Sequence, residues 1–114
     1  MTTDKKIMLA VQETAAYADR DAYVSDMALS SIWEYGDEGE VPAERVQLLG
    51  EIWDAVHRSV PDIAAAAGMS MRKLAERFCI PYRTVENWSA GSRSCPLYVS
   101  LMMQECLGLL HRPD

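Results

Sequence analysis

Residues 68–88, GMSMRKLAERFCIPYRTVENW, contain two helix-length segments separated by a very short break. Ser70 is a favoured residue for the position before a helix, and a helix over residues 71–78 carries its apolar side chains on one face. The break at residues 79–81 follows from Pro81, because the residue before a proline is pushed out of helical geometry. A second helix is predicted over residues 82–90. Two helices with so short a connection are expected to pack crosswise, and this requires a small side chain where they cross.

Apolar residues at spacings of three and four continue along most of the chain, and alternating β-branched residues are nearly absent. The sequence therefore predicts an all-α fold, a compact bundle of about six helices that contains a helix-turn-helix and carries an N-terminal helical extension. In residues 43–58 the predicted core-facing side chains are Val46, Leu49, Ile52, Trp53 and Val56. The helical segments are expected at residues 5–17, 22–33, 43–58, 59–67, 71–78, 82–90 and 97–110.

At 114 residues the chain has the size of one domain, and 49% apolar and 25% charged residues are ordinary for a globular protein. We expect an acidic N-terminal extension, residues 1–58, packed on a core formed by the helix-turn-helix region, residues 59–114. The longest mostly apolar run, residues 96–110, is interrupted by three polar residues, and the first thirty residues lack the apolar stretch of a signal peptide. These features predict a cytoplasmic protein without a membrane contact.

Charge is unevenly distributed along the chain. The net charge is −6, which argues against contact with nucleic acid, because neutralising phosphates requires a basic surface. Residues 69–99, however, contain five Lys or Arg residues and two Glu residues and so have a net charge of +3, whereas residues 1–68 have a net charge of −8. The sequence predicts an acidic body that carries one basic segment.

The thirty-residue segment SMRKLAERFCIPYRTVENWSAGSRSCPLYV resembles the helix-turn-helix of Cro and phage-repressor-type regulators, the XRE family. Ala75 is the small residue of the first helix, Val85 and Trp88 anchor the second, and a glycine, a polar loop and a proline follow. The resemblance implies a transcriptional regulator, in the simplest case a repressor, that binds double-stranded DNA as a homodimer and places residues 82–90 in the major groove. The turn position that the family often gives to glycine is Cys79 in this sequence. A positive φ at this residue would cost about 1 kcal/mol.

A second register of the same sequence also has the helix-turn-helix pattern. IAAAAGMSMRKLAERF resembles the first motif of arabinose-regulator-type activators, with Ala64 at the crossing, Gly68 in the turn and residues 71–78 as the reading helix. Those proteins have a second motif after a long linking helix, whereas here the next helix begins three residues later. The glycine, loop and proline that follow residue 90 favour the downstream register.

Successive helical residues differ by about 100°, so Val85 and Trp88 on the buried side place Arg83, Glu86 and Asn87 on the opposite side. An Arg side chain can donate two hydrogen bonds to guanine, an Asn side chain can pair with adenine, and a Glu side chain can accept from cytosine. The residues predicted to contact bases are Tyr82, Arg83, Glu86 and Asn87. The residues predicted to contact the DNA backbone are Arg72, Lys73, Thr84 and Arg93, of which Arg72 and Arg93 follow from the resemblance.

No enzyme site is evident in the sequence. His57 and Asp54 lie one helical turn apart, but no nucleophile or third group is placed beside them, and neither histidine of the chain has the spacing of a metal ligand. Cys79, Cys95 and Cys106 form neither an even disulfide set nor a Cys-x-x-Cys pair, which predicts free and mostly packed thiols. We therefore expect no enzyme activity, no metal and no cofactor.

A function of a different class also fits the sequence. A protein-interaction module of the antitoxin or inhibitor type would use the acidic N-terminal half to bind another protein, with the helix-turn-helix in a structural or autoregulatory role. Asp37, Glu38, Glu40 and Glu44 would then form the binding patch. The two functions differ in salt dependence, because binding to DNA weakens steeply as counterions compete for the phosphates.

Overall fold

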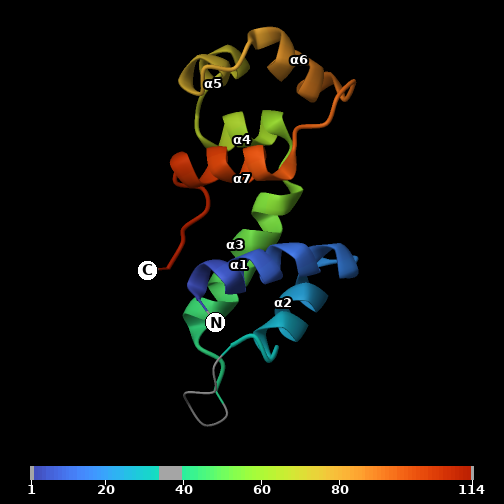
Figure 1. Ribbon diagram of the computed structural model, residues 1–114, viewed down its shortest axis with the longest axis vertical. Helices are drawn as coiled ribbons and strands as arrows, with labels where there is room; N and C mark the ends of the chain where they lie inside the picture. Colours follow the sequence, from blue (N-terminus) through green and yellow to red (C-terminus); the bar gives the residue numbers. More distant parts are fainter. Residues whose placement is uncertain (1, 34–39, 114) are drawn as a thin grey trace. The chain divides into compact units, whose positions relative to one another are not determined.

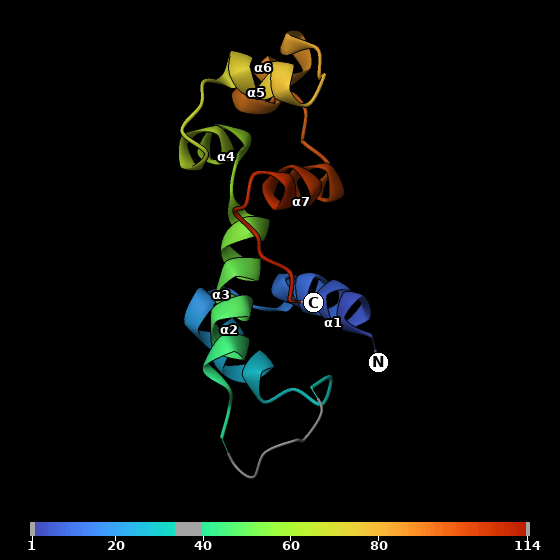
Figure 2. The same ribbon diagram turned by 90° about the vertical axis from the view of Figure 1, so that its left-hand side faces the viewer.

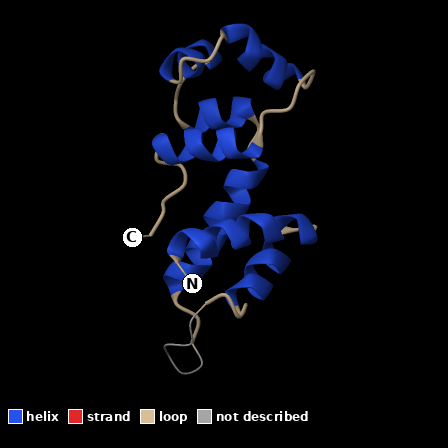
Figure 3. Cartoon of the chain, in the orientation of Figure 1, coloured by secondary structure: helices blue, strands red, loops and turns tan. Residues whose placement is uncertain are grey.

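The computed structural model describes residues 2–33 and 40–113, and these residues form seven α-helices and one short 3₁₀ helix. No strand occurs in the described ranges (Figure 3). The predicted all-α class is therefore confirmed. Figure 1 labels the α-helices in chain order. Within the same ranges, none of the helices combines the length and the apolar character that a membrane span needs.

The chain divides into two compact units. The N-terminal unit contains the described residues up to 56 together with residues 111–113, and the second unit consists of residues 57–110. Each unit buries its own set of apolar side chains.

The N-terminal unit is built around a buried tyrosine. The Tyr23 ring is fully buried 5.3 Å from the Trp53 ring, and its hydroxyl donates a hydrogen bond of 2.6 Å to the Ala10 carbonyl. Burial raises the pKa of the Tyr23 phenol, because the charged form is poorly solvated there. The helices that contribute to this unit are α1 (Thr3–Glu13), the 3₁₀ helix Thr14–Ala16, α2 (Arg20–Ala28) and α3 (Ala43–His57).

The first helix is shorter than the sequence predicted. A helix was expected over residues 5–17, but α1 stops at Glu13. The Thr14 hydroxyl donates to the Val11 carbonyl, 2.7 Å away, and the chain tightens into the 3₁₀ turn. Such a side-chain bond to the preceding turn competes with continuation of the helix.

The second helix also ends early. The prediction covered residues 22–33, whereas α2 stops at Ala28. The indole N–H of Trp33 donates a hydrogen bond of 2.7 Å to the Met27 carbonyl. Because this contact satisfies a carbonyl that a further helical turn would have used, it stabilises the end of the helix where it is.

The third helix agrees with its predicted bounds to within one residue. Leu49, Ile52 and Trp53 are buried as predicted, and Val56 is partly buried. Val46 is 42% exposed, so its predicted place in the core is wrong.

The first three helices of the second unit start and end within one residue of their predicted bounds. The hydroxyls of Ser59 and Ser70 accept hydrogen bonds from the backbone N–H three residues later, at 3.2 and 3.1 Å. Gly68 and Gly91, at φ 71° and 79°, follow the ends of two helices. Figure 2 shows the helices of this unit after a turn of the view by 90° about the vertical axis. The four helices are α4 (Val60–Ala66), α5 (Met71–Arg77), α6 (Tyr82–Ala90) and α7 (Leu97–Cys106).

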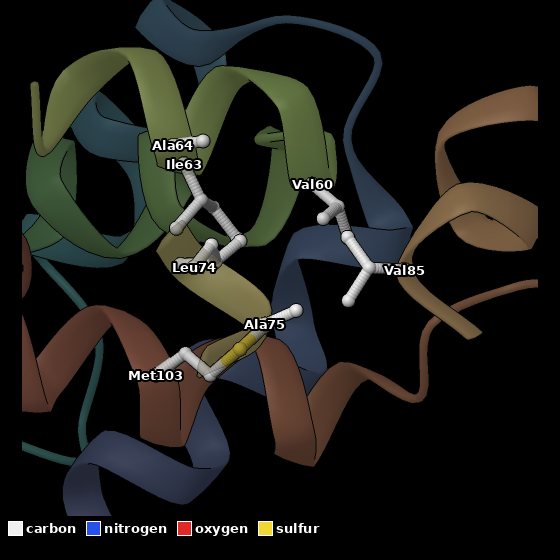
Figure 4. Close-up of a cluster of buried hydrophobic side chains, with 7 residues drawn as sticks. All are labelled: Val60, Ile63, Ala64, Leu74, Ala75, Val85 and Met103. Atoms are coloured by element: carbon white, nitrogen blue, oxygen red, sulfur yellow. The ribbon is translucent and has the colours of Figure 1, made fainter. Parts of the chain in front are cut away.

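The core of the second unit joins all four of its helices. Helices α4, α5 and α6 pack on one another, and α7 adds Met103 to the cluster (Figure 4). Ala64 and Ala75, the small residues of the two possible registers, are both buried in this cluster. The remaining members shown in Figure 4 are Val60, Ile63, Leu74 and Val85.

The last helix ends four residues before the predicted limit at residue 110. Helix α7 stops at Cys106, and Gly108 adopts φ 75°. The Leu109 N–H donates a hydrogen bond of 2.8 Å to the Gln104 carbonyl, which closes the helix in the manner usual for a left-handed glycine. The glycine signal was present in the sequence but stands within a run of apolar residues.

The three cysteines are free thiols, as predicted, but they are less packed than expected. Cys79 and Cys106 are exposed, and only Cys95 is partly buried. Burial raises the pKa of the Cys95 thiol.

Candidate nucleic-acid interface

The junction between α5 and α6 is a tight turn that requires an unusual backbone angle. Cys79, at the position that the resembling family often gives to glycine, adopts a positive φ of 55°. The Ile80 N–H then donates a hydrogen bond of 2.9 Å to the Ala75 carbonyl, which closes the end of α5. This turn joins α5 to α6 within a few residues, and the two helices pack together with Ala75 and Val85 in the same core cluster.

Helix α6 has one buried and one exposed side. Val85 is fully buried, and Trp88 is partly buried and packs against the same cluster. On the opposite side Arg83 and Glu86 are exposed and Asn87 is partly buried. The predicted division of the helix into an anchoring side and an outward side is therefore present.

The outward polar side chains have no partner in the described part of the chain. No hydrogen bond or ion pair within residues 2–33 and 40–113 engages the side chains of Arg83, Glu86 or Asn87. Arg83 and Glu86 are exposed to solvent, where a ligand can meet them, and Asn87 is partly exposed beside them. Arg83 and Asn87 lie four residues apart and so are separated by roughly 6 Å along the helix axis.

The end of α6 is fixed by backbone hydrogen bonds that leave the Asn87 side chain available. The Ser92 N–H donates to the Asn87 carbonyl at 3.1 Å, and the Ser92 hydroxyl donates to the same oxygen at 3.3 Å. Arg93 follows in an exposed loop. This loop is the place where a contact with the DNA backbone was predicted.

Two of the predicted contact residues meet each other. The guanidinium of Arg72, near the start of α5, stacks over the ring of Tyr82, the first residue of α6, at 4.1 Å from the ring centroid. Tyr82 is partly buried against the core cluster, whereas Arg72 and Lys73 are exposed. The sequence assigned Tyr82 to bases and Arg72 to the backbone and gave no sign that the two side chains touch. Thr84 is partly buried on the same helix as Tyr82.

The residues weighed for an enzyme site have structural partners. The Asp54 carboxylate accepts hydrogen bonds from the Arg20 guanidinium at 3.0 and 3.2 Å, and this pairing raises the Arg20 pKa. Among the residues that the structure describes, no group of His, Cys, Asp and Glu side chains is arranged to hold a metal ion.

The acidic patch predicted for a protein partner is only partly visible. Asp37 and Glu38 lie outside the described residues. Glu40 and Glu44 are exposed.

An open pocket of about 370 Å³ in the N-terminal unit was not predicted from the sequence. Several of its charged groups are engaged within the protein. The Arg45 guanidinium donates to the Ala28 carbonyl at 3.0 Å and lies over the Trp33 ring, and His111 Nδ1 lies 2.9 Å from the Glu51 carboxylate. These contacts give the pocket walls a structural role and leave the outward side of α6 as the stronger candidate site.

Comparisons of the chain with protein-family models, curated proteins and solved structures give no significant match.

Proposed function

We propose that the chain is a sequence-specific DNA-binding transcriptional regulator that places α6 in the major groove. One observation carries the proposal: Val85 and Trp88 pack inward, whereas Arg83, Glu86 and Asn87 face outward without a partner among the described residues. A short helix that presents unpaired hydrogen-bonding groups on one side has the form that major-groove readout requires.

The spacing of the outward side chains suits base recognition. Arg83 can donate two hydrogen bonds to guanine O6 and N7, and Asn87 can pair with adenine N6 and N7. Their separation of roughly 6 Å along the helix is close to two base-pair steps of about 3.4 Å each. Glu86 lies beside them on the same side of the helix and can accept a hydrogen bond from cytosine N4.

The charge around α6 supports contact with phosphates. Residues 69–99 have a net charge of +3 in a chain whose net charge is −6. Three exposed cationic residues flank α6 in the sequence: Arg72 and Lys73 precede it, and Arg93 follows it. Thr84, on α6 itself, adds a hydroxyl. Contacts of this kind orient a protein on DNA and leave sequence readout to other side chains.

We further propose that the protein acts as a homodimer and represses by occluding a promoter. A single α6 offers few base contacts, and two copies on half-sites about one helical turn apart are the usual way to reach useful specificity. The exposed apolar side chains of Leu97, Tyr98 and Met102 on α7 support a contact between copies. The three free cysteines are consistent with the reducing conditions of the cytoplasm, where we place the protein.

The test is selection of bound sequences from a random DNA pool, followed by binding measurements over a range of salt concentrations. We expect a palindrome to be enriched and affinity to fall with salt at a log–log slope of about −0.9 per neutralised phosphate. Arg83→Ala should relax preference at one position of each half-site, at a cost of about 1–3 kcal/mol in discrimination. Arg77→Ala is the matched control, because it removes the same charge from α5 without touching the outward side of α6.

An unenriched pool would overturn the proposal. If binding is also absent at low salt, the alternative of an antitoxin-type or inhibitor-type interaction module that acts through the acidic N-terminal half becomes the better hypothesis. A reporter that is activated by the protein would contradict repression while leaving DNA binding intact.

A further inference from the structure

The stacked pair of Arg72 and Tyr82 lies beside the residue most suited to reading a base. Tyr82 immediately precedes Arg83 at the start of α6, and Arg72 reaches it from α5. The tyrosine ring is held in place by the core cluster, because it packs against it. The guanidinium therefore rests on a fixed platform, although the Arg72 residue is exposed.

Stacking leaves the hydrogen-bonding capacity of the guanidinium free. An Arg side chain stacks through the flat face of its guanidinium, whereas its five N–H donors lie in the plane and point away from the ring. No hydrogen bond or ion pair to another described residue engages Arg72. A planar donor group held in this manner fits the bidentate recognition of a phosphate.

The position of the pair favours a phosphate over a base. A helix about 10–12 Å wide nearly fills the major groove, which is about 12 Å wide, so the sugar–phosphate backbones run along its sides. The Arg72 guanidinium extends from α5 and lies over Tyr82, the first residue of α6. In this place it meets a sugar–phosphate backbone before it can reach the base edges. One face of the Tyr82 ring is at the same time covered by Arg72.

We propose that Tyr82 is a positioning residue that holds the Arg72 guanidinium against a DNA phosphate, and that it does not read a base. The proposal rests on the proposed DNA-binding function and replaces the sequence-based assignment of Tyr82 to base contact. Arg72 supplies the contact, and the Tyr82 ring reduces the freedom that Arg72 would lose on binding.

The test measures affinity for a non-specific duplex against salt concentration, together with base preference by selection, in four variants. Arg72→Ala should make the log–log salt slope shallower by about 1. Tyr82→Phe keeps the ring and should bind like the wild type, whereas Tyr82→Leu should weaken binding to all sequences alike, by roughly two- to fivefold. In the Arg72→Ala background, Tyr82→Leu should have no further effect.

The matched control is Arg77→Ala, which removes an arginine that also lies over a ring, that of Phe78, at 5.6 Å. Arg77 is five residues from Arg72 and points about 140° away around the helix, so its loss should leave the slope unchanged. An equal change in both Arg variants would overturn the proposal, because general attraction would then explain the effect of Arg72.

Other results also decide the matter. If Tyr82→Phe loses as much affinity as Tyr82→Leu, the hydroxyl contacts DNA itself. If Tyr82→Leu alters base preference, Tyr82 reads a base. Each of these two results contradicts the proposal. Should Tyr82→Leu fail to fold, Arg72→Lys replaces it, because Arg72 is exposed. That variant keeps the charge but loses the planar stack, and an affinity equal to that of the wild type would contradict the proposal. If the wild type binds no DNA, both this proposal and the proposed function fail, whereas any of the other results leaves the function standing.

Discussion

In the described ranges Cys79, in the turn before α6, is the one residue other than glycine that has a positive φ, at 55°. A left-handed backbone costs a non-glycine residue roughly 1–2 kcal/mol, and a glycine at the same position avoids this cost. Glycine also has greater freedom in the unfolded chain, which lowers the stability of the folded state by roughly 0.4–1 kcal/mol. We therefore expect Cys79→Gly to raise the free energy of unfolding by about 0.5–1 kcal/mol. Urea denaturation followed by circular dichroism measures the change.

The control for this substitution is Cys79→Ala, which also removes the exposed thiol but keeps the strained backbone. It should unfold at the same urea concentration as the wild type. Equal stability of the glycine and alanine variants would mean that the turn stores no strain at Cys79.

Tyr23 gives the N-terminal unit a dependence on alkaline pH. Burial raises the pKa of its phenol above the value of about 10 that it has in the unfolded chain. The folded state therefore binds the phenolic proton more tightly, so the stability is fully present below about pH 10 and is lost as the pH rises towards the folded pKa. Above about pH 10 the loss from this group should approach 1.4 kcal/mol per pH unit.

Tyr23→Phe separates this effect from other titrations. At neutral pH the variant should lose about 1 kcal/mol, because the hydrogen bond to the Ala10 carbonyl is absent. As the pH rises above about 10, it should lose less stability than the wild type, and the difference between the two urea midpoints should shrink. Tyr17, whose pKa is also raised, remains in both proteins. Parallel curves for the two proteins would exclude the assigned role.

At the scale of whole elements, several helix ends were predicted from a local capping residue. Ser59, Ser70 and Gly91 cap their helices through their own side chain or backbone, and the bounds of α4, α5 and α6 follow from these residues. The early end of α2 depends on the Trp33 indole reaching the Met27 carbonyl, a contact that apolar periodicity does not encode.

The candidate site also contains features that the sequence predicted and one that it did not. The periodicity of α6 alone placed Val85 and Trp88 inward and Arg83 and Asn87 outward, because one helix sets all four directions. The stack of Arg72 on Tyr82 joins two helices and depends on how they cross, so the sequence could not reveal it.

Helix α7 is tied to the start of its unit by a buried polar side chain. The amide of Gln104, which is fully buried, accepts a hydrogen bond of 2.9 Å from the Arg58 guanidinium and donates one of 3.0 Å to the Ser100 hydroxyl. Gln104→Ala should lower the free energy of unfolding by about 1–3 kcal/mol, because buried polar groups lose their partner. The exposed Gln47 provides a control: Gln47→Ala should change stability by less than about 0.5 kcal/mol. A loss at Gln104 no larger than at Gln47 would show that the network contributes nothing.

At the scale of the whole molecule, the proposed function depends on a second copy, because each chain offers only one candidate recognition helix among its described residues. Ten of the fourteen residues at 97–110 are apolar, and α7 turns Ser100, Met103 and Gln104 inward while Tyr98 and Met102 remain 69% and 56% exposed. This outward side carries apolar area that a symmetric contact between two copies can bury, since the same patch can face itself across a two-fold axis.

Lysines at these two positions should separate the copies without unfolding the chain. In Tyr98→Lys/Met102→Lys, like charges meet across the two-fold axis, so the light-scattering mass should fall from two chains to one. Affinity for a palindrome should fall by roughly a hundredfold, because the second half-site no longer binds as part of one complex. Affinity for a single half-site should stay the same, since α6 is unchanged.

Leu29→Lys, at a residue that is 72% exposed in the N-terminal unit, is the control for an added charge and should leave the mass unchanged. A wild-type mass of one chain at micromolar concentration, or an undiminished dimer in the double variant, would remove α7 as the interface and leave the specificity of a single α6 to be explained by DNA contacts elsewhere.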